Sequence, residues 1–223
     1  PSLKQRLKNI LPAPLLRLLR SAPAYGFFGS YASWKEALRD SGGYDDAAIL
    51  KKIISSAQKV KRGEAAYERD SVTFAEPSPN LALVRILRNI ASESGDALNL
   101  IDFGGSLGSA YFQNKDALQP IDIRWNVVEQ SHFAKAGEAF ADEHLRFFAN
   151  LATAQKETGA RTFFSSSTLQ YLPEPYKTLK EVADLGFEYL VFDRMLLGDV
   201  ERLMVQKVPP RIYEASYPVW ILS

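Results

Sequence analysis

The stretch that most constrains the fold is residues 98–108, Leu-Asn-Leu-Ile-Asp-Phe-Gly-Gly-Ser-Leu-Gly. Four apolar residues within 98–103 are typical of a short buried strand, and residues 110–118 are predicted to form a helix. Between them, the glycines predict a tight turn whose backbone can approach a ligand closely and point N–H groups at it. A strand, a glycine turn and a helix in succession predict a parallel α/β sheet with a ligand at this turn.

Two acids accompany the turn in a pattern that suits a nucleoside. Asp102 stands just before the glycines, and the Gly-x-Gly-x-x-Gly run that cradles a pyrophosphate is absent. Glu129 ends the next predicted strand, Trp125-Asn-Val-Val-Glu129. From that position a carboxylate can accept hydrogen bonds from two ribose hydroxyls. The alternative, a turn that only reverses the chain, stays open.

The turn and the second acid together resemble the signature of class I S-adenosylmethionine-dependent methyltransferases, Asp-x-Gly-x-Gly-x-Gly followed by a ribose-binding acid. Asp102, Gly104 and Gly108 fit it, whereas Ser106 replaces the middle glycine and Gly105 lies one place earlier. The spacing between the two acids is also several residues longer than is usual in that family. The resemblance implies S-adenosylmethionine as cofactor, methyl transfer as activity, and a Rossmann-like, mostly parallel sheet flanked by helices in the order 3-2-1-4-5.

Segments spread over nearly the whole chain also resemble a methyltransferase family found among bacterial cell-surface polysaccharide genes. They are residues 29–34, 43–44, 68–71, 125–130 and 205–218. This second resemblance implies a small molecule or a glycan precursor as methyl acceptor, and a role in polysaccharide biosynthesis. Because members of that family usually continue with a further helix and strand, we expect the chain to be truncated at Ser223.

Composition excludes several classes of function. The 27 basic and 26 acidic residues nearly cancel, so bulk charge does not indicate nucleic acid as a partner. The absence of cysteine excludes a disulfide scaffold and fits a cytoplasmic protein. The two histidines, His132 and His144, are too few and too poorly placed to predict a metal site. We therefore expect no metal, and the sequence indicates no oligomeric state.

The predicted elements divide the chain into two parts. Residues 1–95 are predicted to be a helical extension or lid, and residues 96–223 the Rossmann-like domain that binds S-adenosylmethionine. Strands are predicted near 98–103, 125–129, 145–149, 161–165 and 187–193. Because helices alternate with these strands, we expect parallel βαβ units with right-handed crossovers. Later strands or a hairpin are predicted within 201–208 and 212–222.

The first 20 residues are basic and amphipathic. Such a stretch is typical of a peripheral segment lying on an anionic membrane surface, here the inner membrane. A pair of short helices packed on the domain fits the same pattern, and both interpretations stay open.

Ligands of an open parallel sheet gather at the carboxyl ends of its strands. This rule and the resemblance select the cofactor-binding candidates Asp102, Gly104, Gly105, Ser106, Gly108, Glu129, Gln130, Asn150, Ser165 and Ser166. The resemblance implies that Glu129 holds the ribose, that Asn150 meets the adenine amine, and that the two serines lie beside the methionine. The alternative is structural, because asparagine and serine are also common in turns and as capping residues.

Aromatic and charged residues of the extension predict an acceptor pocket. Residues 25–34 and 67–71 are expected to fold over the cofactor rim, because aromatic faces and charged groups suit sugars. The substrate-binding candidates are Tyr25, Tyr31, Trp34, Arg69 and Arg194. In the alternative, the aromatic residues only anchor the extension to the core.

No catalytic base stands out in the sequence. Three weak candidates, Asp193, Tyr171 and Asp70, lie on the predicted rim or in the predicted lid. Ser106 and the missing base motivate a second hypothesis, a degenerate methyltransferase fold that acts as a non-catalytic binding or scaffold module.

Overall fold

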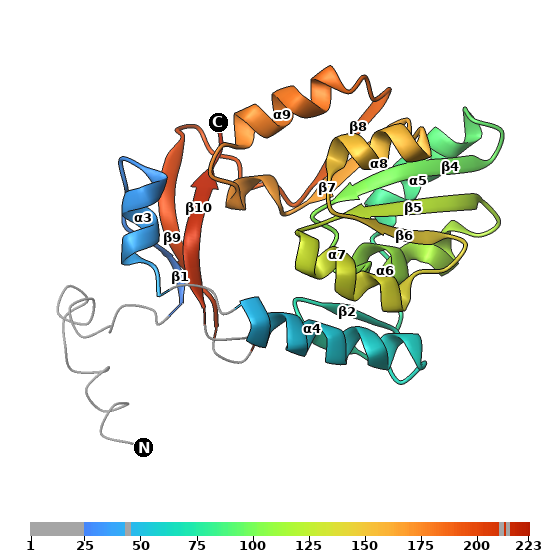
Figure 1. Cartoon of the computed structure of the whole chain (residues 1–223), viewed down its shortest axis with the longest axis horizontal. Helices are drawn as coiled ribbons and strands as arrows, with labels where there is room; N and C mark the ends of the chain where they lie inside the picture. Colours follow the sequence, from blue (N-terminus) through green and yellow to red (C-terminus); the bar gives the residue numbers. More distant parts are fainter. Residues whose placement is uncertain (1–24, 43–45, 210–211, 213–214) are drawn as a thin grey trace, which may run out of the picture.

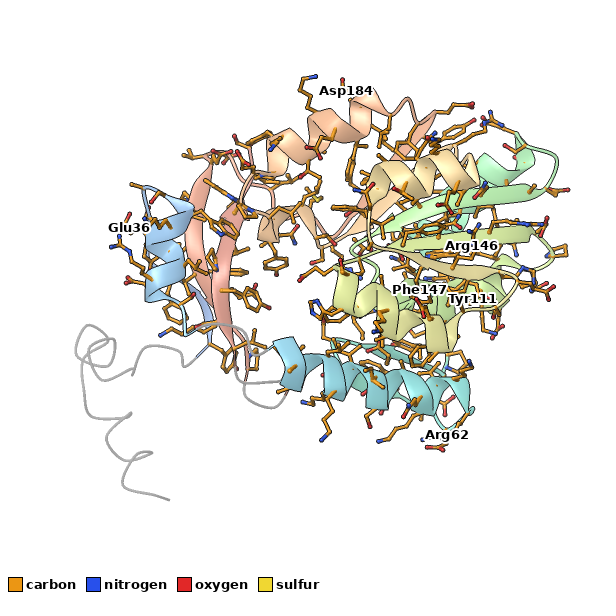
Figure 2. All side chains as sticks on the ribbon, in the orientation of Figure 1. Glu36, Arg62, Tyr111, Arg146, Phe147 and Asp184 are labelled. Carbon is orange, nitrogen blue, oxygen red and sulfur yellow. The ribbon has the colours of Figure 1, made fainter. Side chains whose placement is uncertain are left out.

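The computed structural model describes residues 25–42, 46–209, 212 and 215–223, and Figure 1 shows their arrangement. The two interpretations of residues 1–20 concern a segment outside these described residues. Figure 2 shows Tyr111 and Phe147 among packed side chains, whereas Arg62 and Asp184 project from the outside of the molecule.

Five parallel strands form the central sheet. They are β4 (Ala97–Phe103), β5 (Asp122–Val128), β6 (Leu145–Phe148), β7 (Thr162–Ser166) and β8 (Tyr189–Asp193). Their order across the sheet is β6-β5-β4-β7-β8, which is the predicted order 3-2-1-4-5. The strand positions are confirmed to within a few residues; the largest shift is β5, which begins at Asp122. The chain thus has a Rossmann-like parallel sheet.

Helices cover both faces of this sheet (Figure 1). They are α5 (Leu81–Ser92), α6 (Ser109–Leu118), α7 (Ser131–Gly137), α8 (Leu151–Thr158) and α9 (Pro175–Asp184), with short 3-10 turns η1 (Glu138–Phe140) and η2 (Leu169–Tyr171).

Alternation along β4 divides its side chains between the two faces. Leu98 and Leu100 pack with α5 and α6, and Ile101 packs with α8 and α9. All three are at most 1% exposed, and each contributes about 1.5–3 kcal/mol through burial. Burial on both faces explains why this strand is almost continuously apolar. It also fixes the direction in which β4 delivers its turn to the edge of the sheet.

A second, antiparallel sheet joins segments from near both ends of the described chain. β9 (Arg202–Lys207) lies in its centre, between β1 (Gly26–Phe28) and β10 (Ser216–Ile221). The β9–β10 pair confirms the strands predicted within 201–208 and 212–222. β1 was not predicted, because three residues that include a glycine carry no strand periodicity of their own.

The remaining elements lie before β4. They are α3 (Trp34–Asp40), α4 (Asp46–Lys61), β2 (Tyr67–Arg69) and β3 (Val72–Phe74). α3 packs on one face of the β1–β9–β10 sheet, whereas β2 and β3 form a hairpin that contacts both α4 and α6. The described residues between 25 and 95 therefore form α3, α4 and α5 together with three short strands.

Candidate functional site

The glycine turn after β4 is shaped by two close approaches. Gly104 has a φ of +78°, and a Cβ built there would lie 2.2 Å from Thr168 Oγ1. A Cβ on Gly105 would lie 2.4 Å from Asp102 Oδ2. Neither position has room for a side chain, so both glycines are required by the fold. Their backbone is left uncovered by side-chain atoms of their own, which is the property that lets a ligand approach.

Asp102 lies inside the protein, beneath the turn. It is 1% exposed, and Trp125 Nε1 donates a hydrogen bond to its Oδ2 at 2.9 Å. Burial raises the pKa of Asp102 to about 7, the Trp125 hydrogen bond opposes this rise, and the charge on Glu129 adds to it. Asp102 is thus a predicted cofactor residue whose side chain supports Gly105 from below.

Glu129 joins the ends of β4 and β5. Its Oε1 accepts a hydrogen bond from the Ser106 N–H at 3.1 Å, and its Oε2 accepts one from the Gln130 N–H at 2.9 Å. Burial raises the pKa of Glu129, and these two N–H groups oppose the rise. The structure therefore brings the predicted acid and the predicted turn into direct contact. Each carboxylate oxygen keeps a lone pair for a further donor.

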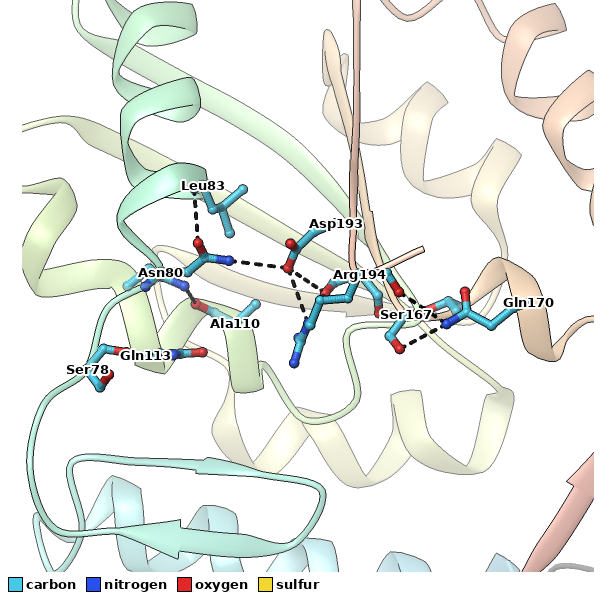
Figure 3. Close-up of polar contacts among 12 residues, drawn as sticks. Ser78, Asn80, Leu83, Ala110, Gln113, Ser167, Gln170, Asp193 and Arg194 are labelled. Atoms are coloured by element: carbon cyan, nitrogen blue, oxygen red, sulfur yellow. Dashed lines mark hydrogen bonds and ion pairs between the residues drawn. The ribbon is translucent and has the colours of Figure 1, made fainter. Parts of the chain in front are cut away.

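A polar network lies at the ends of β7 and β8, and Figure 3 shows its members Asn80, Asp193 and Arg194. Asp193 Oδ2 accepts hydrogen bonds from Ser166 Oγ at 2.9 Å and from Asn80 Nδ2 at 3.3 Å. The Arg194 guanidinium donates to Ser166 Oγ and forms an ion pair with Asp193, with Nε 3.3 Å from Oδ2. Ser165 is fully buried and donates to the Phe103 carbonyl at 3.1 Å. Asp193 and Arg194 are thus held together at the sheet edge.

Two other predicted cofactor residues stand at helix starts. Asn150 is the N-cap of α8, and its Oδ1 accepts a hydrogen bond from the Thr153 N–H at 2.9 Å. Gln130 precedes α7 and is exposed, and its side chain makes no capping bond. The capping role of Asn150 is the ordinary one for such a residue, and its oxygen keeps a second lone pair.

The acceptor candidates are spread over several places. Tyr31 and Trp34 pack against the core that Ala37 forms with β9, on the face of the small sheet that α3 covers. Tyr25 is 54% exposed at the start of β1. Arg69 and Asp70 lie in the β2–β3 hairpin, next to α6. Tyr31 and Trp34 thus take part in the packing of α3, and the acceptor role of all five candidates stays a prediction.

Tyr171, a candidate base, connects the rim to the small sheet. Its hydroxyl donates a hydrogen bond to Gln206 Oε1 on β9 at 2.7 Å. Its ring meets the Tyr217 ring of β10 edge to face, with centroids 5.2 Å apart. Through these contacts η2, which follows β7, is attached to the face of the small sheet opposite α3.

Strained backbone is concentrated around the same edge of the sheet. Within the described residues, six non-glycine residues have positive φ. Ser167 and Arg194 directly follow β7 and β8, and Ser106 lies in the glycine turn after β4. Asp70 and Ser71 form the turn of the hairpin beside α6, whereas the sixth residue, Asp96, precedes β4 at the opposite edge. Each such conformation costs about 1–3 kcal/mol and persists only where the surroundings impose it, typically at functional sites.

Two residues that join the hairpin to the glycine turn, Glu68 and Ser109, were not among the predicted site residues. Glu68 is 3% exposed and accepts a hydrogen bond from Ser109 Oγ, at the first position of α6. The only signal was the run of charged residues from Glu68 to Asp70 before an apolar strand.

A surface hollow of about 540 Å³ lies away from this edge, between the end of α4, the hairpin and the side of α6. It contains none of the predicted site residues. Over the part of the chain that the structure describes, no group of three or more His, Asp or Glu side chains is placed to hold a metal ion. The described helices include none long and apolar enough to cross a membrane.

Comparisons with known proteins add a likeness of fold only. No family model and no curated protein matches the chain. A crystal structure of the N-terminal domain of EvdMO1, in the presence of SAH and D-fucose, matches 81% of this chain and 82% of that chain, with 14% identity and a TM-score of 0.40. Human N-acetylserotonin methyltransferase, in complex with SAM, matches 76% of this chain and 52% of that chain, with 12% identity and a TM-score of 0.32. Likenesses this weak assign no function, and the fold rests on the strand order itself.

Proposed function

We propose that this protein transfers a methyl group from S-adenosylmethionine to a small molecule or glycan precursor. The observation that carries the proposal is the contact between Glu129 and the glycine turn at the carboxyl ends of β5 and β4, next to the switch point between β4 and β7. There the carboxylate, anchored by the Ser106 N–H at 3.1 Å, keeps lone pairs for a ribose diol. The polysaccharide role is the finer part of this proposal and rests on the family resemblance alone.

The turn fits the amino-acid part of such a cofactor. The N–H groups of Gly105 and Leu107 have no hydrogen-bond partner among the described residues. Both precede α6, whose N-terminus favours negative charge. Unpaired N–H groups in this position suit a carboxylate.

The sulfonium of the bound cofactor supplies a reactive methyl group, so the protein chiefly has to position the acceptor and exclude water. The residues placed to do this lie beyond the turn, on the β7 and β8 side. Arg194 is held there by Ser166 and Asp193, with its side chain 46% exposed. An exposed guanidinium in a fixed position can orient an acceptor through its hydroxyl or anionic groups.

Glu129→Ala is expected to weaken S-adenosylmethionine binding at least ~10-fold, because two charge-assisted hydrogen bonds to the ribose are lost. The melting temperature should change little, because the two N–H contacts that are lost are offset by removing a carboxylate whose burial is unfavourable. Isothermal titration calorimetry measures the affinity, and Glu138→Ala, an exposed carboxylate on η1, is the matched control. Unchanged affinity in Glu129→Ala would contradict the proposed cofactor position.

Transfer itself is tested with radiolabelled S-adenosylmethionine and fractionated glycan precursors. A labelled product that requires the protein supports an enzyme. Cofactor binding without labelled product in any fraction favours the alternative of a non-catalytic binding module.

A further inference from the structure

The β2–β3 hairpin places a buried carboxylate beside the glycine turn. Glu68 is 3% exposed, and its Oε2 accepts a hydrogen bond from the Ser71 N–H at 3.1 Å. Its Oε1 accepts one from Ser109 Oγ, one residue after Gly108. In Figure 1, β2 lies between α4 and α6, which agrees with its contacts to both helices. Glu68 is therefore fixed at the start of α6 from two sides.

This carboxylate has no counter-ion of its own. Among the described residues, none of the ion pairs includes Glu68. The adjacent cation, Arg69, projects from the other face of the strand, with its guanidinium 5.9 Å from the centre of the Tyr67 ring. A buried carboxylate without a cation is unfavourable, because desolvation is not offset by an opposite charge. Burial accordingly raises the pKa of Glu68.

Unpartnered polar atoms gather in the same hairpin. Four buried side-chain nitrogen or oxygen atoms of the described residues lack a hydrogen-bond partner, and two of them are Arg69 Nε and Ser71 Oγ. Ser71 is 6% exposed and has a φ of +64°, a conformation that a serine adopts only at some energetic cost. Arg69 Nε belongs to the other face of β2, whereas Ser71 is bonded to Glu68 through its own N–H. Buried polar groups are normally paired, so the unpartnered Ser71 Oγ next to a carboxylate without a cation points to a polar ligand.

We propose that Glu68 binds the ammonium group of the cofactor's methionyl moiety. This inference rests on the proposed function, because it takes the glycine turn as the place of the amino-acid end. That end is a zwitterion: its carboxylate suits the N–H groups before α6, and its ammonium needs a carboxylate within reach. Ser109 links Glu68 directly to this turn, and the ammonium supplies the charge that Glu68 lacks.

The test compares two ligands that differ only at this end. S-adenosylhomocysteine carries the amino acid, whereas 5′-methylthioadenosine has the same adenosine and thioether without it. Glu68→Gln keeps the size of the side chain and an acceptor for Ser109, but removes the charge. We expect S-adenosylhomocysteine to bind about 10-fold or more weakly to this variant, and 5′-methylthioadenosine to bind within about 2-fold of the wild type. Calorimetry on the full chain measures both.

Glu129→Ala is the contrasting variant, because the ribose is common to both ligands and both affinities should fall together. An equal change, or no change, for the two ligands in Glu68→Gln overturns the role of Glu68 while leaving the proposed function intact. A wild-type protein that binds neither ligand overturns the proposed function and this inference together.

A second measurement needs no variant. The wild type is titrated with the analogue of S-adenosylhomocysteine that lacks only the amino group. We expect its affinity to be about 10-fold or more below that of S-adenosylhomocysteine. Equal affinity for the two compounds would overturn the assignment even if Glu68→Gln did not fold.

Discussion

Gly104→Ala is expected to lower the free energy of unfolding by roughly 2–5 kcal/mol, the sum of a left-handed backbone penalty and overpacking. The alanine would have to keep a φ near +78°, and its Cβ would lie 2.2 Å from Thr168 Oγ1. Relief requires the turn after β4 to move away from η2. We therefore expect S-adenosylmethionine binding to fall as well, because the turn would no longer lie against Glu129.

Gly63→Ala is the matched control for this variant. Gly63 has nearly the same φ, +74°, but a Cβ there would meet nothing within 4 Å. The free energy of unfolding of Gly63→Ala should fall only by the cost of the left-handed backbone, about 1–2 kcal/mol. Chemical denaturation of both variants isolates the contact with Thr168. Equal destabilisation of the two would show that the Gly104–Thr168 approach does not constrain the turn.

Asp102→Asn is expected to make the protein more stable than the wild type at pH 8. The pKa of Asp102 is about 7 in the folded protein, against an ordinary value of 3.8. Between these values the folded state holds a proton that the unfolded state has lost, so stability falls as pH rises from about 4 to about 7. Above that window the ionised carboxyl destabilises the fold by ~4 kcal/mol. Asparagine stays neutral throughout and can still accept from Trp125.

The measurement is the free energy of unfolding of both proteins across pH 4–8. Glu129 and Arg194 also act on Asp102, and both remain in the variant. Their own titration is therefore common to both proteins, and the difference reports the titration of Asp102 together with its interaction with these two charges. Asp199→Asn, at an exposed position, is the control and should follow the wild type at every pH. A difference between wild type and Asp102→Asn that does not change with pH would contradict the raised pKa.

The β1–β9–β10 sheet connects the segment around β1 to the parallel sheet. Tyr171 reaches Gln206 from η2, and the Tyr31 amide donates to the Leu203 carbonyl at 3.0 Å. The strands β9 and β10 are thereby tied both to the edge of the parallel sheet and to the segment around β1.

Local sequence patterns determined the central part of the molecule. The apolar run of β4 predicted a short buried strand, and the glycines after it predicted a tight turn. Alternation of strands and helices then fixed a parallel sheet with short right-handed connections. The position of Glu129 beside the turn followed from that topology, because the carboxyl ends of neighbouring parallel strands meet at one edge.

Tertiary structure alone decided the remaining contacts. β1 is too short for periodicity and exists because β9, far along the chain, offers its edge. In the sequence, the aromatic residues Tyr31 and Trp34 fit a ligand pocket and core packing equally well. The position of α3 decides which surface they contact. Glu68 shows the same limit most clearly. Its burial and its bond to Ser109 depend on how a hairpin docks against a helix, and such long-range packing is not encoded in the residues near Glu68 in the sequence.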